Sequence, residues 1–159
     1  MTDTHTRLWR LIDLVSKEEL HLFGVITRLF DDLSPTVSAS RLDLLLQSPE
    51  GIDRLESFVG KFSRMQDTVM DKLIPAFLDA TGEQTGTALD NLNRLHRIGF
   101  VTNPDAWIGM RRLRNKLVHE YVEDITELAA ALQKARSLAD ELRHTFRAIR
   151  TYADQNFPR

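Results

Sequence analysis

The chain has 159 residues, of which 42% are hydrophobic and 28% charged, which is typical of one globular domain that buries its own core. It contains no cysteine, which excludes disulfides and thiolate metal sites. The formal net charge is only −2, so the chain lacks the overall basic character that would indicate a nucleic-acid partner by itself.

No targeting or membrane-spanning segment is expected. Residues 1–6 lack the basic and then apolar pattern of a signal peptide. No apolar run approaches the roughly 18 residues that a transmembrane helix needs. We therefore expect a soluble, cytoplasmic protein with no membrane contact and with a single domain over residues 1–159.

The first third of the chain has helical periodicity. Apolar residues recur at three- and four-residue spacing from Leu8 to Leu33, which predicts an amphipathic helix. Ser16 and Glu19 have the spacing of a capping box, which predicts a break or kink there. Residues 34–40 have the composition of a loop, and residues 41–47 look like one or two helical turns. Together they form an insertion of loop and short helix around residues 34–48.

A long second helix is predicted from about Pro49 to Ala80. Ser48 can cap it, because proline is favoured at the first helical position and serine just before it. Pro75 lies inside this segment and should kink the helix or break its hydrogen bonding locally.

Three further helices follow. Residues 82–86 form a predicted turn, after which Thr85 or Thr87 can cap a third helix that ends before Gly99. A fourth helix starts near Pro104 and a fifth near Asp124. No stretch alternates apolar and polar residues as a strand would. The predicted fold is all-α, an up-and-down bundle of four to five helices.

Positive charge is concentrated in one region of this acidic protein. Residues 86–119 carry a net charge of +4, so the remainder carries −6. A local basic patch suits a polyanionic substrate, although the charge alone is explained as well by a solvated helix face. The patch is densest in the fourth helix, where four cations lie within six residues: Arg111, Arg112, Arg114 and Lys116. Such crowding destabilises a helix, and a bound anion would offset the repulsion.

The same helix carries side chains suited to proton transfer. Asn115 and His119 are four residues apart and therefore share a face, while Arg114 and Tyr121 lie seven apart and nearly in register. A guanidinium can bind a phosphate, an amide can orient a substrate, and an imidazole can move a proton near neutral pH. We therefore predict one polar edge with Arg114, Asn115 and His119 as catalytic residues, and we take Arg111, Arg112 and Lys116 as candidate RNA contacts.

This set suffices for RNA cleavage without a metal, because RNA supplies its own nucleophile in the 2′-hydroxyl. We expect no cofactor and no metal, since the five histidines are dispersed and show no ligand spacing with carboxylates. One histidine can supply the acid or the base, but not both. A symmetric homodimer would bring two into one cleft.

The pattern Arg114-Asn115-x-x-x-His119-x-Tyr121 resembles the signature of the HEPN superfamily, and the tyrosine two residues after the histidine resembles its HepT toxin branch. About eight residues carry the specific likeness, and the all-α layout is similar over most of the chain. The resemblance implies a metal-independent endoribonuclease toxin that acts on RNA rather than DNA as a homodimer. It also implies a nucleotidyltransferase antitoxin of the MNT type that attaches AMP to the tyrosine, here Tyr121.

Each of these residues also has a plain structural interpretation. His119 could cap a helix, and Tyr121 could anchor the helix end on the core. Arg111, Arg112 and Lys116 could simply solvate a face. Trp107 fits the core or a dimer interface better than a base-stacking platform, and His96 fits the edge of the core. A polar stripe on the second helix, Ser63, Arg64, Asp67 and Asp71, could face the motif, but a solvated face is favoured.

Two other functions remain open at this point. The chain could be a non-catalytic helical module that partners a nucleotidyltransferase and presents Tyr121 or a substrate to it. It could also be a bundle used only for assembly, with the motif a coincidence. The pairing of Arg114 with His119 favours catalysis over both.

Overall fold

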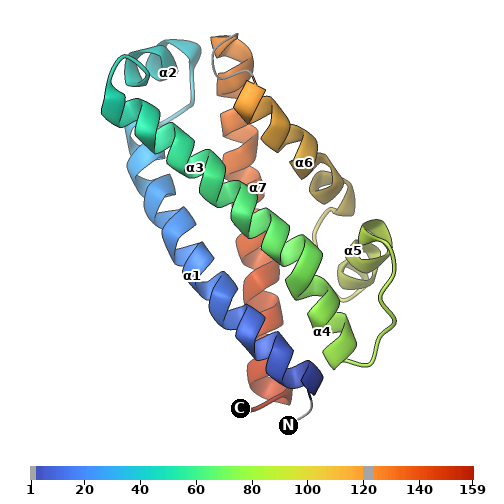
Figure 1. Ribbon diagram of the computed structural model, residues 1–159. Coiled ribbons are helices and arrows are strands. Elements are labelled where there is room, and N and C mark those ends of the chain that lie inside the picture. The colour runs from blue at the N-terminus through green and yellow to red at the C-terminus, as the bar shows by residue number, and fades with distance from the viewer. Residues whose placement is uncertain (1–2, 120–123) are drawn as a thin grey trace.

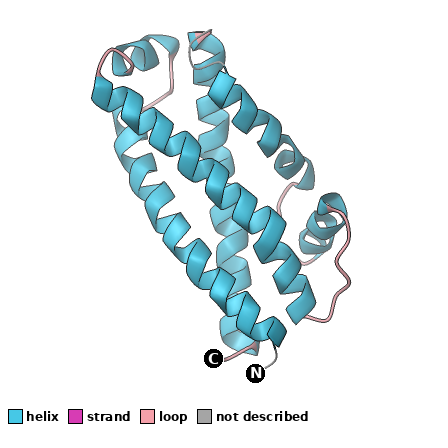
Figure 2. Cartoon of the chain, viewed as in Figure 1, coloured by secondary structure: helices cyan, strands magenta, loops and turns pink. Residues whose placement is uncertain are grey.

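The computed structural model describes residues 3–119 and 124–159, and its regular elements there are all helical. The all-α bundle predicted from periodicity is therefore confirmed (Figures 1 and 2). No helix within the described ranges is long and apolar enough to cross a membrane.

The helices follow one another along the chain with mostly short connections. Their bounds are α1 (Asp3–Asp32), α2 (Ala39–Leu45), α3 (Pro49–Thr68), the π-helix η1 (Val69–Leu73), α4 (Ile74–Ala80), α5 (Ala88–Arg97), α6 (Pro104–His119) and α7 (Ile125–Asn156). All five predicted helices are present. The short turn expected at residues 41–47 is α2, and the single helix expected over residues 49–80 is divided into α3, η1 and α4.

Four long segments run alternately up and down (Figure 1). These are α1, the α3–η1–α4 segment, α6 and α7, and each is antiparallel to the one before it. The short helix α2 covers one end of the bundle, and α5 lies beside α4 and the start of α6. This arrangement sets α6 against both α3 and α7, which decides what its charged residues can reach.

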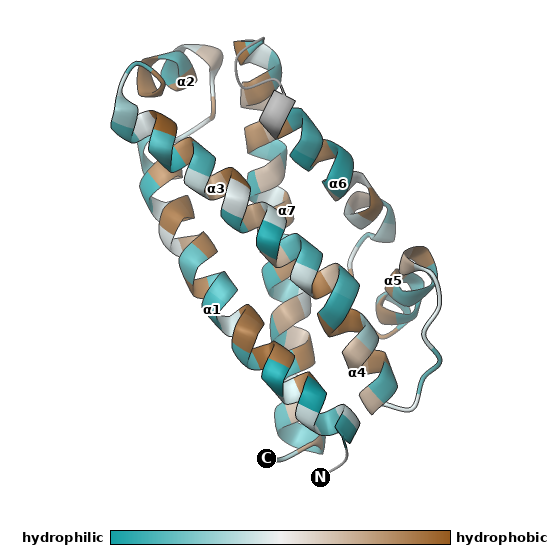
Figure 3. Ribbon diagram, in the orientation of Figure 1, coloured by the Kyte–Doolittle hydropathy of each residue, from teal (hydrophilic) through white to brown (hydrophobic). Residues whose placement is uncertain are grey.

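Each helix buries one apolar stripe, so that brown and teal surfaces alternate along the ribbons in Figure 3. Among the described residues, the five largest fully buried side chains are all aromatic, and they come from α3, α4, α6 and α7: Phe58, Phe62, Phe77, Trp107 and Phe146. Burying one such side chain stabilises the fold by about 1.5–3 kcal/mol relative to leaving it exposed. Apolar burial therefore provides the frame that holds the polar residues described below.

Serine, threonine and aspartate cap the helices where the sequence predicts. The Ser48 side chain accepts a hydrogen bond from the Gly51 amide, with Pro49 in the first turn of α3. Thr87, rather than Thr85, caps α5 in a reciprocal capping box with Asp90. Asp124 caps α7.

The break expected at Ser16–Glu19 is wrong, because α1 continues without interruption from Asp3 to Asp32. Both acids that follow Ser16 turn inward and bind other helices instead of capping α1. Glu18 contacts Thr68 on α3, and Glu19 contacts arginines on α7. Glu19, the acid of the predicted capping box, therefore makes a tertiary contact and does not cap a helix.

The disturbance expected from Pro75 takes the form of a π-turn. Proline has no N–H and its ring collides with the carbonyl four residues earlier, so an ordinary α-helix cannot pass through it unchanged. Here the helix widens over Val69–Leu73, and the Ile74 amide bonds to the Val69 carbonyl five residues back. Short π-turns of this kind are frequently found at functional sites.

The capping of α5 gives a matched test. Thr87→Ala removes the side-chain acceptor for the Asp90 amide, so it should lower the free energy of unfolding by about 1 kcal/mol and the Tm by about 2–4 °C. Thr85→Ala, two residues earlier in the exposed connection, should change neither. Thermal unfolding followed by circular dichroism measures both variants, and equal losses in the two would contradict this capping.

Candidate functional site

Helix α6 presents its charged residues outward because an apolar stripe fixes its rotation. Trp107, Met110, Leu113 and Leu117 are all buried, as their helical spacing predicts. Asn103 caps the start of α6 by accepting hydrogen bonds from the Asp105 and Ala106 amides. The cations of α6 therefore lie at its surface and along its border with α3.

Two of these arginines bind carboxylates on the neighbouring segment. Nη1 of Arg114 lies 2.8 Å from both carboxylate oxygens of Asp67, and Nη2 of Arg111 lies 2.7 Å from both oxygens of Asp71. Both pairs are partly open to solvent, and the Arg114 side chain is the more covered, at 27% exposed. The motif arginine is therefore held against α3, with part of its guanidinium still open to solvent.

The polar stripe Ser63, Arg64, Asp67 and Asp71 was expected to be a solvated face, with contact to the motif as the alternative. The two aspartates remain about half exposed, but they also contact the motif helix. Asp67 and Asp71 face α6 and offset the repulsion among its crowded cations. The physical reason is the antiparallel packing of α6 along α3, which sets two arginines opposite two carboxylates. Periodicity on one helix gives no information about its neighbour.

An open cavity of about 360 Å³ lies between these elements. Four cations and two anions line it, together with the Thr68 hydroxyl: Arg64, Lys72, Arg111, Arg114, Asp67 and Asp71. The charged lining has a net charge of +2. Arg64 and Lys72 form no ion pair with any described residue. The surplus of positive charge suits the cavity to an anionic ligand.

The other predicted residues of α6 do not line this cavity. Asn115 and Arg112 are exposed, and Lys116 forms a salt bridge with Glu127 on α7. His119 is the last residue of α6, and its side chain lies outside what the structure describes. Tyr121 also lies outside the described residues. Of the predicted α6 residues whose side chains are described, Arg111 and Arg114 line one cavity and Lys116 is directed toward α7.

The structure shows where Trp107 and His96 lie, two residues that the sequence assigned to the core and to its edge. Trp107 is fully buried, as expected of a core residue, and its Nε1 donates to Glu141 on α7 at 3.3 Å. His96 is exposed rather than at the edge of the core, and its Nδ1 lies 2.8 Å from the Val101 carbonyl. Because a carbonyl only accepts, that nitrogen carries the hydrogen. Neither residue lines the cavity.

Beneath the cavity, Glu18 of α1 is buried against Thr68. The Thr68 Oγ1 atom lies 3.0 Å from Glu18 Oε2 and 2.9 Å from the Arg64 carbonyl oxygen. The Thr68 hydroxyl donates to Glu18, and the Arg64 carbonyl competes for its single hydrogen. Glu18 Oε1 is buried without a partner, which disfavours the charged form. Burial accordingly raises the pKa of Glu18 above its ordinary value.

Several residues at this site could not be identified from the sequence. Arg64, Thr68 and Lys72 line the cavity and Glu18 contacts Thr68, yet none belongs to the α6 motif. The stripe on α3 was the one available signal for Arg64, whereas the π-turn that carries Lys72 changes the register after Thr68. Gln66, fully buried with an unpartnered Oε1, gave no signal either.

The described residues include no cluster of histidine and acidic side chains that could hold a metal ion. A scan against protein-family models found no match for the chain, and searches of curated proteins and of solved structures found none either. The chemical capacity of the site therefore follows from its residues: two arginines in a cavity of net positive charge, on a helix that ends at a histidine.

The raised pKa of Glu18 predicts how stability depends on pH. An acid whose pKa is higher in the folded protein stabilises the fold below its unfolded value, ordinarily 4.5, and this contribution is lost as pH rises through the folded value. Glu18→Gln imitates the protonated form. Its Tm should therefore exceed that of the wild type at pH 7, and the difference should shrink as pH falls below 4.5.

Thermal unfolding between pH 3 and pH 8 measures this difference. Glu56→Gln, at an exposed position on α3, serves as the matched control and should show no such trend. A Glu18→Gln variant that is less stable than the wild type at pH 7 would mean that Glu18 is charged in the folded protein.

Proposed function

We propose that this protein is a metal-independent endoribonuclease whose site is centred on the α6 motif. The observation that carries the proposal is the placement of Arg114 and Arg111 in a cavity of net positive charge, on the helix that ends at His119. Arg64 and Lys72 add cations from the facing segment. The resemblance of residues 114–121 to the HEPN signature supports the same activity.

The reaction assigns a separate task to each group. The 2′-oxygen of the RNA attacks the adjacent phosphorus while the bond from phosphorus to the 5′-oxygen breaks. Arg114 binds the phosphate as negative charge develops on it, and Asn115 orients the substrate. His119 moves one proton, either from the 2′-hydroxyl or to the departing 5′-oxygen.

Asp67 and Asp71 hold the two guanidiniums in place before the substrate arrives. An incoming phosphate competes with these carboxylates for Arg114 and Arg111. Because only Nη1 of Arg114 bonds to Asp67, its remaining nitrogens can reach a phosphate while that contact persists. The carboxylates thus preorganise the arginines and lower the entropic cost of ordering them on binding.

A homodimer would complete the proton transfer. Each chain has one motif histidine, which can act as acid or base but not as both at once. The outward side of α6 carries the exposed residues Ile108, Arg112 and Asn115 at helical spacing, beside the cavity. A second copy packed on this side would bring the two motifs together across one cleft.

Regulation follows from the resemblance to the HepT branch. We propose that the protein is the cytoplasmic toxin of a toxin–antitoxin pair, and that an MNT-type nucleotidyltransferase neutralises it by attaching AMP to Tyr121. A bulky anionic group close to Arg114 and His119 in sequence would exclude RNA by size and by charge.

Cleavage of RNA in EDTA tests the proposal. His119→Ala should lower the rate by about 10²–10⁴-fold because it removes the proton-transfer group. Arg114→Ala should lower it by about 10²–10³-fold because it removes a hydrogen-bond donor to the scissile phosphate. His21→Ala and Arg10→Ala, at exposed positions of α1, are matched controls that should retain full activity. Unchanged cleavage by both motif variants would contradict the assignment.

The intact mass of the protein tests its regulation. Co-expression with a cognate nucleotidyltransferase should add increments matching AMP, and Tyr121→Phe should abolish them while leaving RNA cleavage intact. Increments that persist in Tyr121→Phe would place the modification on another residue.

The alternative function is a non-catalytic helical module that partners a nucleotidyltransferase. The exposed surface of α6 is compatible with such a role. Tight binding of the enzyme by a wild-type protein that cleaves no RNA would favour the module, and RNA cleavage that His119→Ala abolishes would favour the nuclease.

A further inference from the structure

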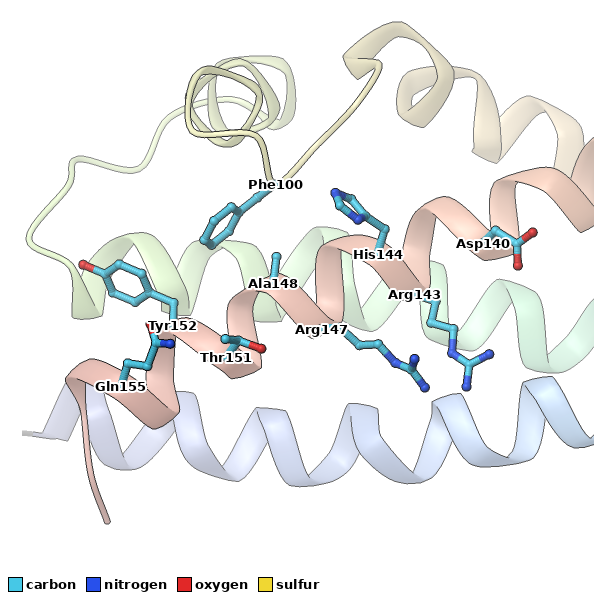
Figure 4. Close-up of a pocket in the computed structure, with 9 residues that line it drawn as sticks. All are labelled: Phe100, Asp140, Arg143, His144, Arg147, Ala148, Thr151, Tyr152 and Gln155. Atoms are coloured by element: carbon cyan, nitrogen blue, oxygen red, sulfur yellow. The ribbon is translucent and has the colours of Figure 1, made fainter.

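A second hollow lies along α7, between α1 and the connection from α5 to α6 (Figure 4). Its volume is about 660 Å³, within the range of small-molecule sites. Its lining shares no residue with the cavity at Arg114. The two small residues Ala148 and Thr151 lie between its two walls, and we call this hollow the α7 groove.

Two arginines form the wall of the α7 groove beside α1. Arg143 and Arg147 are four residues apart and extend in the same direction in Figure 4. Both approach one carboxylate oxygen, Glu19 Oε2, with their Nε atoms at 3.5 and 3.3 Å. The Arg143 guanidinium also lies 4.2 Å from the centre of the Phe23 ring. Arg147 Nε donates a hydrogen bond to Glu19, whereas Arg143 Nε is buried without a hydrogen-bond partner. The two guanidiniums are held near Glu19 by these contacts and, for Arg143, by the Phe23 ring.

The charge around the α7 groove is not balanced. The Glu19 side chain is only 10% exposed and offsets one of the two arginines it contacts. Asp140, at one end of the groove, is paired with Arg136. Three arginines thus face two carboxylates, and a like-charged pair at this helical spacing is unfavourable without an anion. The terminal nitrogens of Arg143 and Arg147 are well placed to bind one.

The opposite wall of the α7 groove is made of rings. Phe100, His144 and Tyr152 line it, and Phe100 and Tyr152 pack edge to face at 6.3 Å. His144 projects from α7 on the side opposite the arginines in Figure 4, and its Nε2 lies 3.3 Å from the Gly99 carbonyl. Planar rings of this kind can stack on a base. Thr151 and Gln155 add polar groups that have no partner among the described residues.

We propose that the α7 groove binds a nucleoside monophosphate. Its phosphate lies between Arg143 and Arg147, and its base crosses Ala148 to pack against Phe100 and His144. Full affinity requires both the phosphate and the base of the ligand, because the cations and the rings are on opposite walls. It does not depend on the nuclease activity of the α6 motif.

Calorimetric titration with AMP, UMP, adenosine and inorganic phosphate tests the proposal on the full chain. The nucleotides should bind, and adenosine and phosphate should each bind at least about tenfold more weakly, because each lacks one half of the contacts. Arg147→Gln should weaken AMP binding about tenfold or more by removing a charged hydrogen-bond donor. Lys134→Gln, at an exposed position of the same helix, is the matched control and should bind as the wild type does.

Two further variants keep the result interpretable. Ala148→Leu fills the floor without changing charge, so it should weaken binding of AMP but not of phosphate. Arg114→Gln alters the cavity at α6 and should leave AMP binding unchanged. Absence of AMP binding at millimolar concentration, or binding that Arg114→Gln abolishes while Arg147→Gln and Ala148→Leu retain it, would overturn the proposal.

Discussion

The ion pair between Arg114 and Asp67 is the contact on which the geometry of the site depends. Helix α6 carries four cations within six residues, and their mutual repulsion opposes formation of the helix. Asp67 and Asp71 offset this repulsion from across the interface with α3. Partly exposed pairs contribute little to stability, about 0–1 kcal/mol each. Their effect is therefore mainly on orientation, and burial of Trp107 and Met110 holds α6 in place.

Beneath that ion pair, polar groups occur where a bundle of this size would normally be apolar. Glu18 reaches Thr68 from α1 directly below the cavity, and the helix widens into a π-turn immediately after Thr68. Both features cost stability locally, because a buried carboxyl must stay neutral or be paired and a π-turn has weaker backbone geometry. A buried carboxyl and a π-turn thus lie next to one another, close to the cationic cavity.

The fold could be predicted because it depends on local signals. Ser48, Thr87 and Asp124 begin helices by the same capping rule, and apolar spacing gives the buried faces. The site could be predicted only in part. Arg114 and Arg111 were identified on α6, but Asp67 was assigned to a solvated face because its partner lies 47 residues away. Glu19 was assigned to a capping box for the same reason, since its contact with Arg147 spans 128 residues. Contacts of that range depend on packing, which periodicity does not encode.

The chemistry of the products tests the central claim most directly. An RNA oligonucleotide incubated with the protein in EDTA should be cut to give a 2′,3′-cyclic phosphate, because the 2′-oxygen is the nucleophile. The same oligonucleotide with 2′-deoxyribose at the cleaved position should remain intact there, and mass spectrometry of the fragments measures both outcomes. Cleavage of the deoxy substrate, or cleavage only when a divalent metal is added, would contradict the account.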